Sequence, residues 1–144
     1  MDKIFERGIE LTGSALIEND RGEILMTLSP KWNNKWILPG GHIEPSETII
    51  SGIIREGEEE TGLSLEGGEI FHFGELIDSN DFHRSAHFIY FDVHCRAKNG
   101  SEVKLDGVEL VSYKWLLPTE ALKLDLAESY KETILKFINF KKAL

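Results

Sequence analysis

The sequence predicts an α/β fold in which β-strands are flanked by α-helices. Segments with the composition of strands are followed by segments with helical spacing, the pattern of layered α/β domains. The chain has 144 residues, 41% of them hydrophobic, which is enough for one hydrophobic core. No repeat, low-complexity tract or Pro/Gly-rich linker divides it. We therefore expect a single domain over residues 1–144, built as an α/β sandwich.

The first part of the chain carries the signals of three strands. Residues 8–17 and 23–28 are strand candidates on either side of a turn at 18–22, which predicts a hairpin. After a loop, residues 36–38 form a short apolar run that ends at Pro39-Gly40-Gly41. Because proline and glycine commonly end strands, we place the end of the third strand there.

The segment 46–61 has helical spacing. Ser46 is a candidate N-cap, and Glu47 would be favourable in the first turn. Gly62 suits the position just past the end of the helix.

The second part of the chain adds three strands and two helices. Residues 69–77 and 87–95 are rich in aromatic and β-branched side chains, and a further strand is expected at 111–116. A short helix should begin at Pro118. Residues 127–142 have the apolar spacing of a closing amphipathic helix.

Composition and charge limit the compartment and the partners. The single cysteine, Cys95, permits no intrachain disulfide, and we expect it to be a small buried residue in a reducing cytoplasm. No apolar run has the length of a signal peptide or a membrane span. The net charge of -9 repels polyanions, so free nucleic acid is not an expected partner. A phosphate-bearing substrate would need metal ions or a local basic patch.

Three glutamates are the most informative feature of the helix at 46–61. Glu56, Glu59 and Glu60 are spaced i, i+3 and i+4, so their carboxylates project from one face. They repel one another and lie near the negative end of the helix dipole, which stability alone does not favour. The helix can pack on a sheet through an adjoining apolar stripe formed by Ile49, Ile50, Ile53 and Ile54.

The segment resembles the Nudix box, the signature of a hydrolase family that includes MutT-like proteins. The box reads Gly-x5-Glu-x7-Arg-Glu-U-x-Glu-Glu-x-Gly-U, in which U is a bulky apolar residue. Eight positions match in register: Gly41, Glu47, Arg55, Glu56, Glu59, Glu60, Gly62 and Leu63. The resemblance implies the Nudix fold, a mixed β-sheet sandwiched between α-helices.

One position departs from the box. The first U is Gly57, which costs about 1 kcal/mol of helix propensity relative to alanine. Gly57 carries no ligand atom, so the departure concerns local stability more than chemistry. A close approach by a neighbouring strand or bulky side chain would compensate.

By this resemblance the chain would use Mg²⁺ or Mn²⁺ to hydrolyse a diphosphate bond by attack of water at phosphorus. The three helix glutamates would hold the metal, with the Gly40 carbonyl as a further ligand. Arg55 would hold a box glutamate in its ionised form, and Glu47 would brace the start of the helix. The positive charge of the bound metal would also offset the electrostatic repulsion between a phosphate and an acidic protein.

The general base and the substrate contacts lie outside the box. Glu109 resembles a loop glutamate that some family members use as base or metal ligand, although a solvated loop acid is an equal alternative. Four side chains are candidates for contact with the substrate, the aromatic ones by stacking and the basic ones by binding phosphate: Trp32, Lys35, Trp36 and Arg84.

The sequence does not single out one substrate. No proline or tyrosine stands about fifteen to eighteen residues after the box, where the resemblance would associate them with ADP-ribose or dinucleoside polyphosphates. We expect a nucleoside diphosphate linked to another moiety, such as a nucleoside triphosphate or a sugar nucleotide. A noncatalytic nucleotide-sensing module and an isomerase on the same scaffold are the alternatives.

The oligomeric state is open at this stage. Either the exposed face of the helix at 127–142 or an edge strand near Gly8 could form a homodimer.

Overall fold

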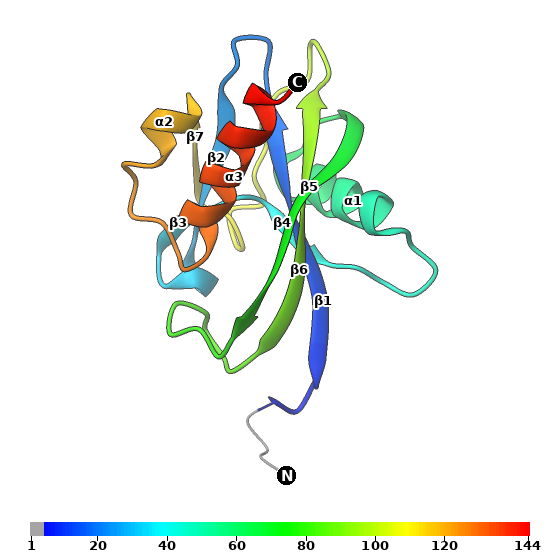
Figure 1. Cartoon of the computed structure of the whole chain (residues 1–144), viewed down its shortest axis with the longest axis vertical. Coiled ribbons are helices and arrows are strands. Elements are labelled where there is room, and N and C mark those ends of the chain that lie inside the picture. The colour runs from blue at the N-terminus through cyan, green and yellow to red at the C-terminus, as the bar shows by residue number, and fades with distance from the viewer. Residues whose placement is uncertain (1–4) are drawn as a thin grey trace.

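The computed structural model describes residues 5–144 and has the expected α/β architecture (Figure 1). Residues 1–4, which belong to the expected single domain over 1–144, lie outside the described residues. The strands are β1 (Ile9–Glu18), β2 (Ile24–Ser29), β3 (Lys35–Ile37), β4 (Gly40–His42), β5 (Leu65–Ile77), β6 (His87–Ala97) and β7 (Ser112–Leu116). The helices are α1 (Ile49–Thr61), α2 (Pro118–Ala121) and α3 (Tyr130–Lys142), with a 3-10 turn, η2 (Pro30–Trp32). Within residues 5–144, no helix has the length and apolar character needed to cross a membrane.

The seven strands form one mixed sheet. Its main path runs β3-β2-β1-β6-β5, with β4 paired to β1 and β7 paired to β2. β1 and β6 are parallel along ten residues, and the other pairs are antiparallel. β6 pairs with one side of β1 along its full length, but on the other side β4 pairs only with Thr12, Gly13 and Ser14 and β2 only with Glu18. Among the described strands, none pairs with that side of β1 near Gly8, so a dimer contact there stays a prediction.

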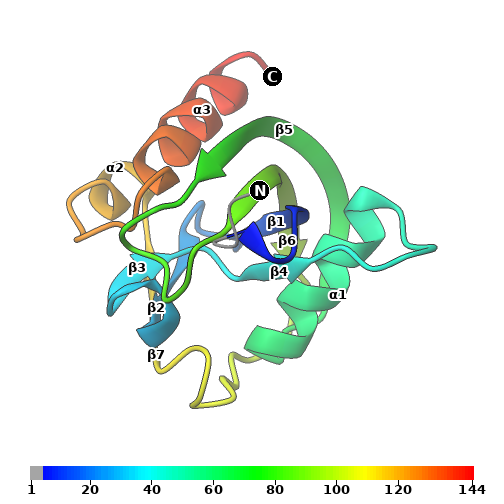
Figure 2. The same ribbon diagram turned by 90° about the horizontal axis from the view of Figure 1, so that it is seen from below.

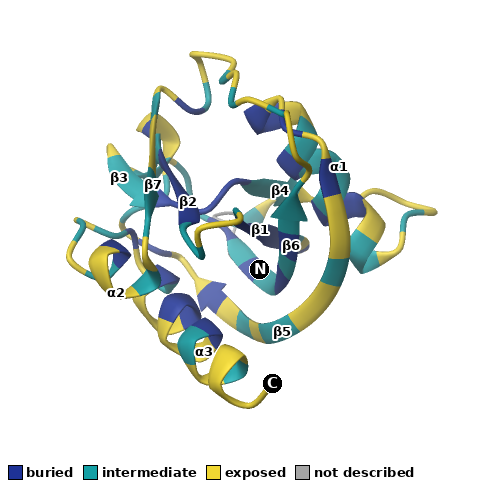
Figure 3. Ribbon diagram, turned by 90° about the horizontal axis from the view of Figure 1, so that it is seen from above, coloured by how far each residue is buried: buried dark blue, intermediate teal, exposed yellow. Residues whose placement is uncertain are grey.

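Helices cover both faces of the sheet, as Figure 2 shows with α1 on one side and α3 on the other. Side chains alternate along β1, so that Leu16 packs with Phe137 of α3 while Ala15 and Ile17 pack with Ile53 of α1. In Figure 3 the buried side of α3 faces the sheet and its outer side is exposed. The isoleucine stripe of α1 lies against the sheet as expected, with Ile53 fully buried.

The close packing of α1 on the sheet explains Gly57. A Cβ at this position would lie 3.0 Å from Leu65 Cδ1 and 3.1 Å from Ala15 Cβ. Both distances are shorter than ordinary van der Waals contact, so a bulky side chain would displace the helix or its neighbours. The compensation anticipated from the sequence is therefore a close approach of α1 to β1 and to the start of β5.

Several element boundaries differ from expectation. Pro39-Gly40-Gly41 does not simply end a strand, because Gly40–His42 forms β4 and pairs with Thr12, Gly13 and Ser14 of β1. β5 begins at Leu65, four residues early, and runs through Gly67 and Gly68 across a shift in register. α3 begins at Tyr130 rather than at 127. A pair of glycines usually indicates a turn when only the local sequence is considered. In β4 and β5, however, pairing with a neighbouring strand keeps the glycines in the sheet.

Cys95 is buried, as expected for a small core residue. Its thiol lies 3.8 Å from the Leu16 carbonyl oxygen, and burial raises its pKa to about 12. The thiol is therefore protonated near neutral pH and has the character of a packing group.

Candidate active site

The helix that carries the acidic residues is fixed at both ends. Thr48, not Ser46, is its N-cap: the Ser51 amide donates to Thr48 Oγ1 at 3.0 Å, and the Thr48 amide donates to Ser51 Oγ at 3.0 Å. Ser46 instead has a φ of 71° and belongs to the preceding turn. Gly62 ends the helix in the left-handed region, at φ 73°, and its amide donates to the Glu58 carbonyl oxygen. The glutamates of the last two turns are thus held at a defined place.

Glycines allow the helix and strand β4 to approach each other. A Cβ at Gly41 would meet the carboxylate of Glu56, and a Cβ at Gly40 would meet the backbone of β1. The Gly40 amide donates toward Glu60 Oε2 at 3.5 Å. The Gly-Gly pair therefore lets β4 run directly beside two carboxylates of the helix.

Arg55 connects the loop before the helix to the glutamates on it. Its guanidinium donates to both oxygens of Glu47, from Nε at 2.6 Å and from Nη2 at 2.9 Å. Its Nη1 donates to Glu56 at 3.0 Å and to Glu59 at 3.2 Å, and Nη2 reaches the His42 carbonyl oxygen at 3.2 Å. These hydrogen bonds raise the pKa of Arg55 and hold the pKa of Glu47 down to about 2. Both groups are charged at any ordinary pH, and the contact orients the carboxylates.

Glu56 and Glu60 lie in the wall of a cavity with a volume of about 230 Å³. Glu60 is 8% exposed. Burial, followed by the charges of Glu56 and Glu109, raises the pKa of Glu60 to about 8. Burial also raises the pKa of Glu56, against the lowering effect of Arg55. One buried and one partly buried carboxylate therefore lie close enough to repel each other.

The other two candidate glutamates differ in exposure. The side chain of Glu59 is 61% exposed, pairs with Arg55 and is not among the residues that line the cavity. Glu109 does line the cavity, and its carboxylate forms a 2.7 Å ion pair with Lys31. Asp106 fixes the loop, because its Oδ1 accepts from the amides of residues 108, 109 and 110. The fold thus brings Glu109 to the box glutamates from almost fifty residues away.

The donor set suits a hard divalent cation. Within residues 5–144, no three His, Cys, Asp or Glu side chains already converge as a finished metal site. The available donors are nevertheless carboxylate oxygens, the ligands that Mg²⁺ and Mn²⁺ prefer. Burial and neighbouring carboxylates raise the pKa values of Glu56 and Glu60, even though Arg55 pairs with Glu56, and a bound cation would oppose both effects. We therefore regard the residues as fitting the expected metal.

The expected substrate contacts divide into one residue at the cavity and three away from it. Trp32 lines the cavity, as does its neighbour Lys31. Lys35 instead pairs with Asp81 at 2.9 Å, and Trp36 lies under the Lys114 ammonium.

Arg84 also has another partner. It donates to both oxygens of Glu10, at 2.9 and 2.7 Å, and this contact lowers the pKa of Glu10 to about 2. Arg84 is not among the residues that line the cavity.

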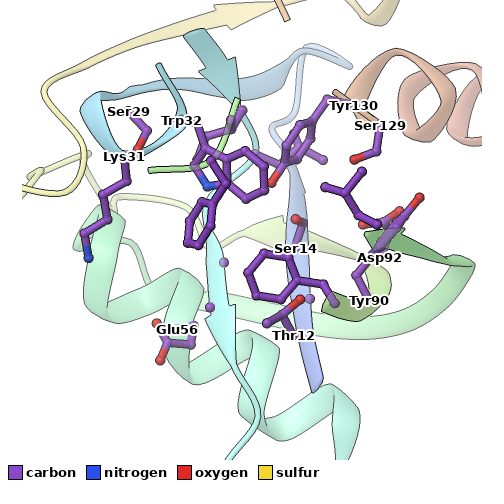
Figure 4. Close-up of a pocket in the computed structure, with 18 of the residues that line it drawn as sticks. Thr12, Ser14, Ser29, Lys31, Trp32, Glu56, Tyr90, Asp92, Ser129 and Tyr130 are labelled. Carbon is purple, nitrogen blue, oxygen red and sulfur yellow. The ribbon is translucent and has the colours of Figure 1, made fainter. Parts of the chain in front are cut away.

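The polar groups on the far side of the cavity were not predicted from the sequence. Figure 4 shows Glu56 and Lys31 on one side and Tyr90 and Asp92 on the other. Asp92 stands alone as a charged residue inside the apolar run of β6, an anomaly that could have drawn attention to it.

Comparison with known proteins places this geometry in a family. Residues 11–137 match the NUDIX domain. Nucleoside triphosphatase NudI of Escherichia coli O17:K52:H18 (strain UMN026 / ExPEC) is 29% identical over 128 residues, which cover 83% of this chain and 89% of that protein. The m7GpppN-mRNA hydrolase NUDT17 of Bos taurus is 36% identical over 70 residues, 44% of this chain. That match spans 22% of the length of the bovine protein.

Solved structures share the same fold. The MutT protein from Methanosarcina mazei Go1 superposes with a TM-score of 0.75 at 24% identity, covering 94% of this chain and 96% of that one. A MutT NUDIX hydrolase from Burkholderia pseudomallei also gives a TM-score of 0.75, at 22% identity, over 89% of this chain and 97% of that one. The arrangement of the sheet and helices is therefore common to this chain and to these two proteins.

Proposed function

The chain belongs to the NUDIX family, and from this we propose that it is a metal-dependent hydrolase of a diphosphate bond in a nucleotide-like substrate. One observation carries the proposal: Glu56 and Glu60 are held together in the wall of a cavity that Lys31 and Glu109 also line. A site of this kind combines donors for a cation with space for a phosphorylated ligand.

Glu56, Glu59 and Glu60 would hold Mg²⁺ or Mn²⁺, with the Gly40 carbonyl beside them. The cation would supply positive charge to the phosphate oxygens and make phosphorus more susceptible to attack by water. Arg55 would act as a positioning residue, because its contacts with Glu47, Glu56 and Glu59 fix the direction of the carboxylates.

The remaining steps fall to residues across the cavity. Lys31 would bind a phosphate oxygen through its ammonium group. Glu109 would accept a proton from the attacking water, because its side chain is 43% exposed and lies on a loop outside the helix that holds the metal. The two products would be phosphorylated fragments, one of which keeps the nucleoside.

Nucleoside triphosphates are the first substrates to test, followed by sugar nucleotides. The match to nucleoside triphosphatase NudI, which extends over most of both chains, supports this order. The proposed chemistry does not require a particular leaving group, since Lys31, Glu109 and the box glutamates would act only on the diphosphate.

The proposal is tested by phosphate and nucleotide release from a panel of nucleoside triphosphates, dinucleotides and sugar nucleotides. Each substrate is incubated with Mg²⁺, with Mn²⁺ and with a chelator. We expect turnover of at least one member with metal and none with chelator. Glu109→Gln should lower kcat by about 100-fold or more if Glu109 is the base.

A matched control is Glu66→Gln, which makes the same change at an exposed glutamate of β5 outside the cavity. It should leave turnover unchanged. Binding of nucleotides without turnover of any substrate would contradict the hydrolase and favour the nucleotide-sensing module.

A further inference from the structure

The cavity has a second polar end that the diphosphate chemistry does not use. Glu56 and Lys31 lie on one side of it, and Asp92, Tyr90 and Ser129 lie on the other (Figure 4). A ligand whose phosphates contact the first side would extend its remaining part toward the second. The side chains at the second side determine which chemical group fits there.

Asp92 is the distinctive group at this end. It lies on β6 beneath α3 and is 1% exposed. Its Oδ2 accepts a hydrogen bond from the Thr133 hydroxyl at 2.8 Å. Within residues 5–144, Oδ1 has no hydrogen-bond partner, and no Lys, Arg or His forms an ion pair with the carboxylate. Since Oδ1 is not among the buried side-chain atoms that lack a partner and Asp92 lines the cavity, this oxygen is open to the cavity, where a ligand can donate a hydrogen bond to it.

Aromatic side chains form the walls between the two ends. Trp32, Phe88 and Tyr130 all line the cavity, and the rings of Trp32 and Tyr130 are 5.9 Å apart at 89°. Trp32 is held in place by Phe82, at a ring distance of 4.6 Å. Flat apolar walls with a hydrogen-bond acceptor at the end suit a flat heterocycle that carries an N–H group.

Because the proposed function brings a nucleotide-like ligand into this cavity, we infer that Asp92 is its specificity-determining residue and accepts a hydrogen bond from an N–H of the nucleobase. The base would lie against Trp32 and Tyr130, with its hydrogen-bonding edge toward β6. Asp92 takes no part in phosphorus chemistry, and it sets which ligands bind well.

The protonation of Asp92 is consistent with this role. Burial raises its pKa to about 7, and the Thr133 hydroxyl opposes that shift. Glu132, Tyr90 and Tyr130 interact with Asp92 electrostatically, and His72 lies opposite it on β5. An N–H from a ligand would compensate for the water that the carboxylate loses on burial.

The amide in Asp92→Asn reverses the hydrogen-bonding character of this end. The Thr133 hydroxyl can donate to the new carbonyl oxygen, which turns the NH₂ group toward the cavity. The acceptor is then replaced by a donor of the same size. Asp20→Asn makes the same change at an exposed residue and serves as the matched control.

The test measures binding of nucleosides, without phosphate or metal, so that it is independent of hydrolysis. Indole N–H signals of Trp32, Trp36 and Trp115 are followed by NMR in the presence of chelator. Trp36 and Trp115 do not line the cavity and serve as internal references. The ligands are uridine, inosine and adenosine, each paired with a counterpart methylated at the N–H: 3-methyluridine, 1-methylinosine and N6,N6-dimethyladenosine.

We expect at least one nucleoside to shift the Trp32 signal and to bind about tenfold or more tightly than its methylated counterpart. Asp92→Asn should reduce this ratio to about one, and Asp20→Asn should leave it unchanged. An equal ratio in wild type and Asp92→Asn would overturn the inference, because the methyl group would then act by size alone. Failure of every nucleoside to shift Trp32 would overturn it too, whereas absence of hydrolysis in the substrate panel would contradict only the proposed reaction.

Discussion

Arg55 and Glu47 form a two-point contact, with the guanidinium Nε and Nη2 donating to the two carboxylate oxygens at 2.6 and 2.9 Å. Glu47 also accepts from the Glu44 amide at 2.8 Å, so the loop before α1 is tied to the helix through one carboxylate. The same guanidinium reaches Glu56 and Glu59. The contact therefore transmits the position of the loop to the acidic groups of the site.

Arg55→Lys should lower activity about 10- to 100-fold and raise the metal concentration needed for half-maximal rate. Lysine keeps the charge but cannot donate to both oxygens of Glu47 in a fixed plane. Kinetics as a function of Mg²⁺ concentration would measure both effects. Arg21→Lys, at an exposed arginine, is the control, and equal kinetics for the two variants would contradict a positioning role for Arg55.

Glu60→Gln should abolish most activity without weakening the fold. In the proposed site the substitution replaces a charged metal ligand with a neutral one, and loss of several kcal/mol of charge stabilisation would correspond to roughly 100-fold or more in rate. The fold gains because a buried group that repels Glu56 becomes neutral. Thermal unfolding in chelator should give a melting temperature at or above that of the wild type. A variant with normal turnover would show that Glu60 is not needed for the metal.

The sequence predicted the helix of the site well because its signals are local. Spacing of the glutamates, the isoleucine stripe and Gly62 all depend on residues within one or two turns of one another. The N-cap was misplaced by two residues, because both Ser46 and Thr48 are good capping residues. Ser46 has a positive φ and belongs to the preceding turn, which leaves Thr48 as the N-cap. This backbone conformation is set by the turn and cannot be predicted from residue type.

Features that depend on distant pairing could not be predicted in the same way. β4 exists because Gly40–His42 pairs with residues of β1 that lie 26 to 30 positions earlier in the sequence. Asp92 reaches the cavity because β6 runs parallel to β1 and α3 covers this part of the sheet. Trp32 and Lys35 are three residues apart, yet one lines the cavity and the other pairs with Asp81. Whether a residue of this segment lines the cavity depends on the direction of its side chain, which the sequence spacing does not give.

Asp92→Asn should also remove a pH dependence of stability. The unfolded chain releases the Asp92 proton near the ordinary pKa of 3.8, whereas burial raises the folded pKa to about 7. Between these values the folded state holds a proton that the unfolded state has lost, so stability falls as pH rises from about 4 to 7 and no further above it. The slope for one proton is at most about 1.4 kcal/mol per pH unit.

The free energy of unfolding of wild type and Asp92→Asn would be measured by urea denaturation at intervals from pH 4 to 8. The free energy of unfolding of the variant minus that of the wild type should increase from pH 4 to 7. Taking this difference cancels the contributions of the other titrating groups, which both proteins share. Asp20→Asn should run parallel to the wild type. A constant difference between wild type and Asp92→Asn would mean that Asp92 keeps an ordinary pKa in the folded protein.

Gly57 offers a test of how tightly α1 packs on the sheet. Gly57→Leu restores the bulky apolar residue of the family's box but places it where even a Cβ would lie 3.0 Å from Leu65 and 3.1 Å from Ala15. We expect a loss of about 1–3 kcal/mol in the free energy of unfolding, the usual cost of overpacking a core. Gly57→Ala should stay within about 1 kcal/mol of the wild type, because its gain in helix propensity offsets milder crowding. Chemical denaturation of both variants gives the comparison, and a leucine variant as stable as the wild type would show that α1 can move away from β1 at little cost.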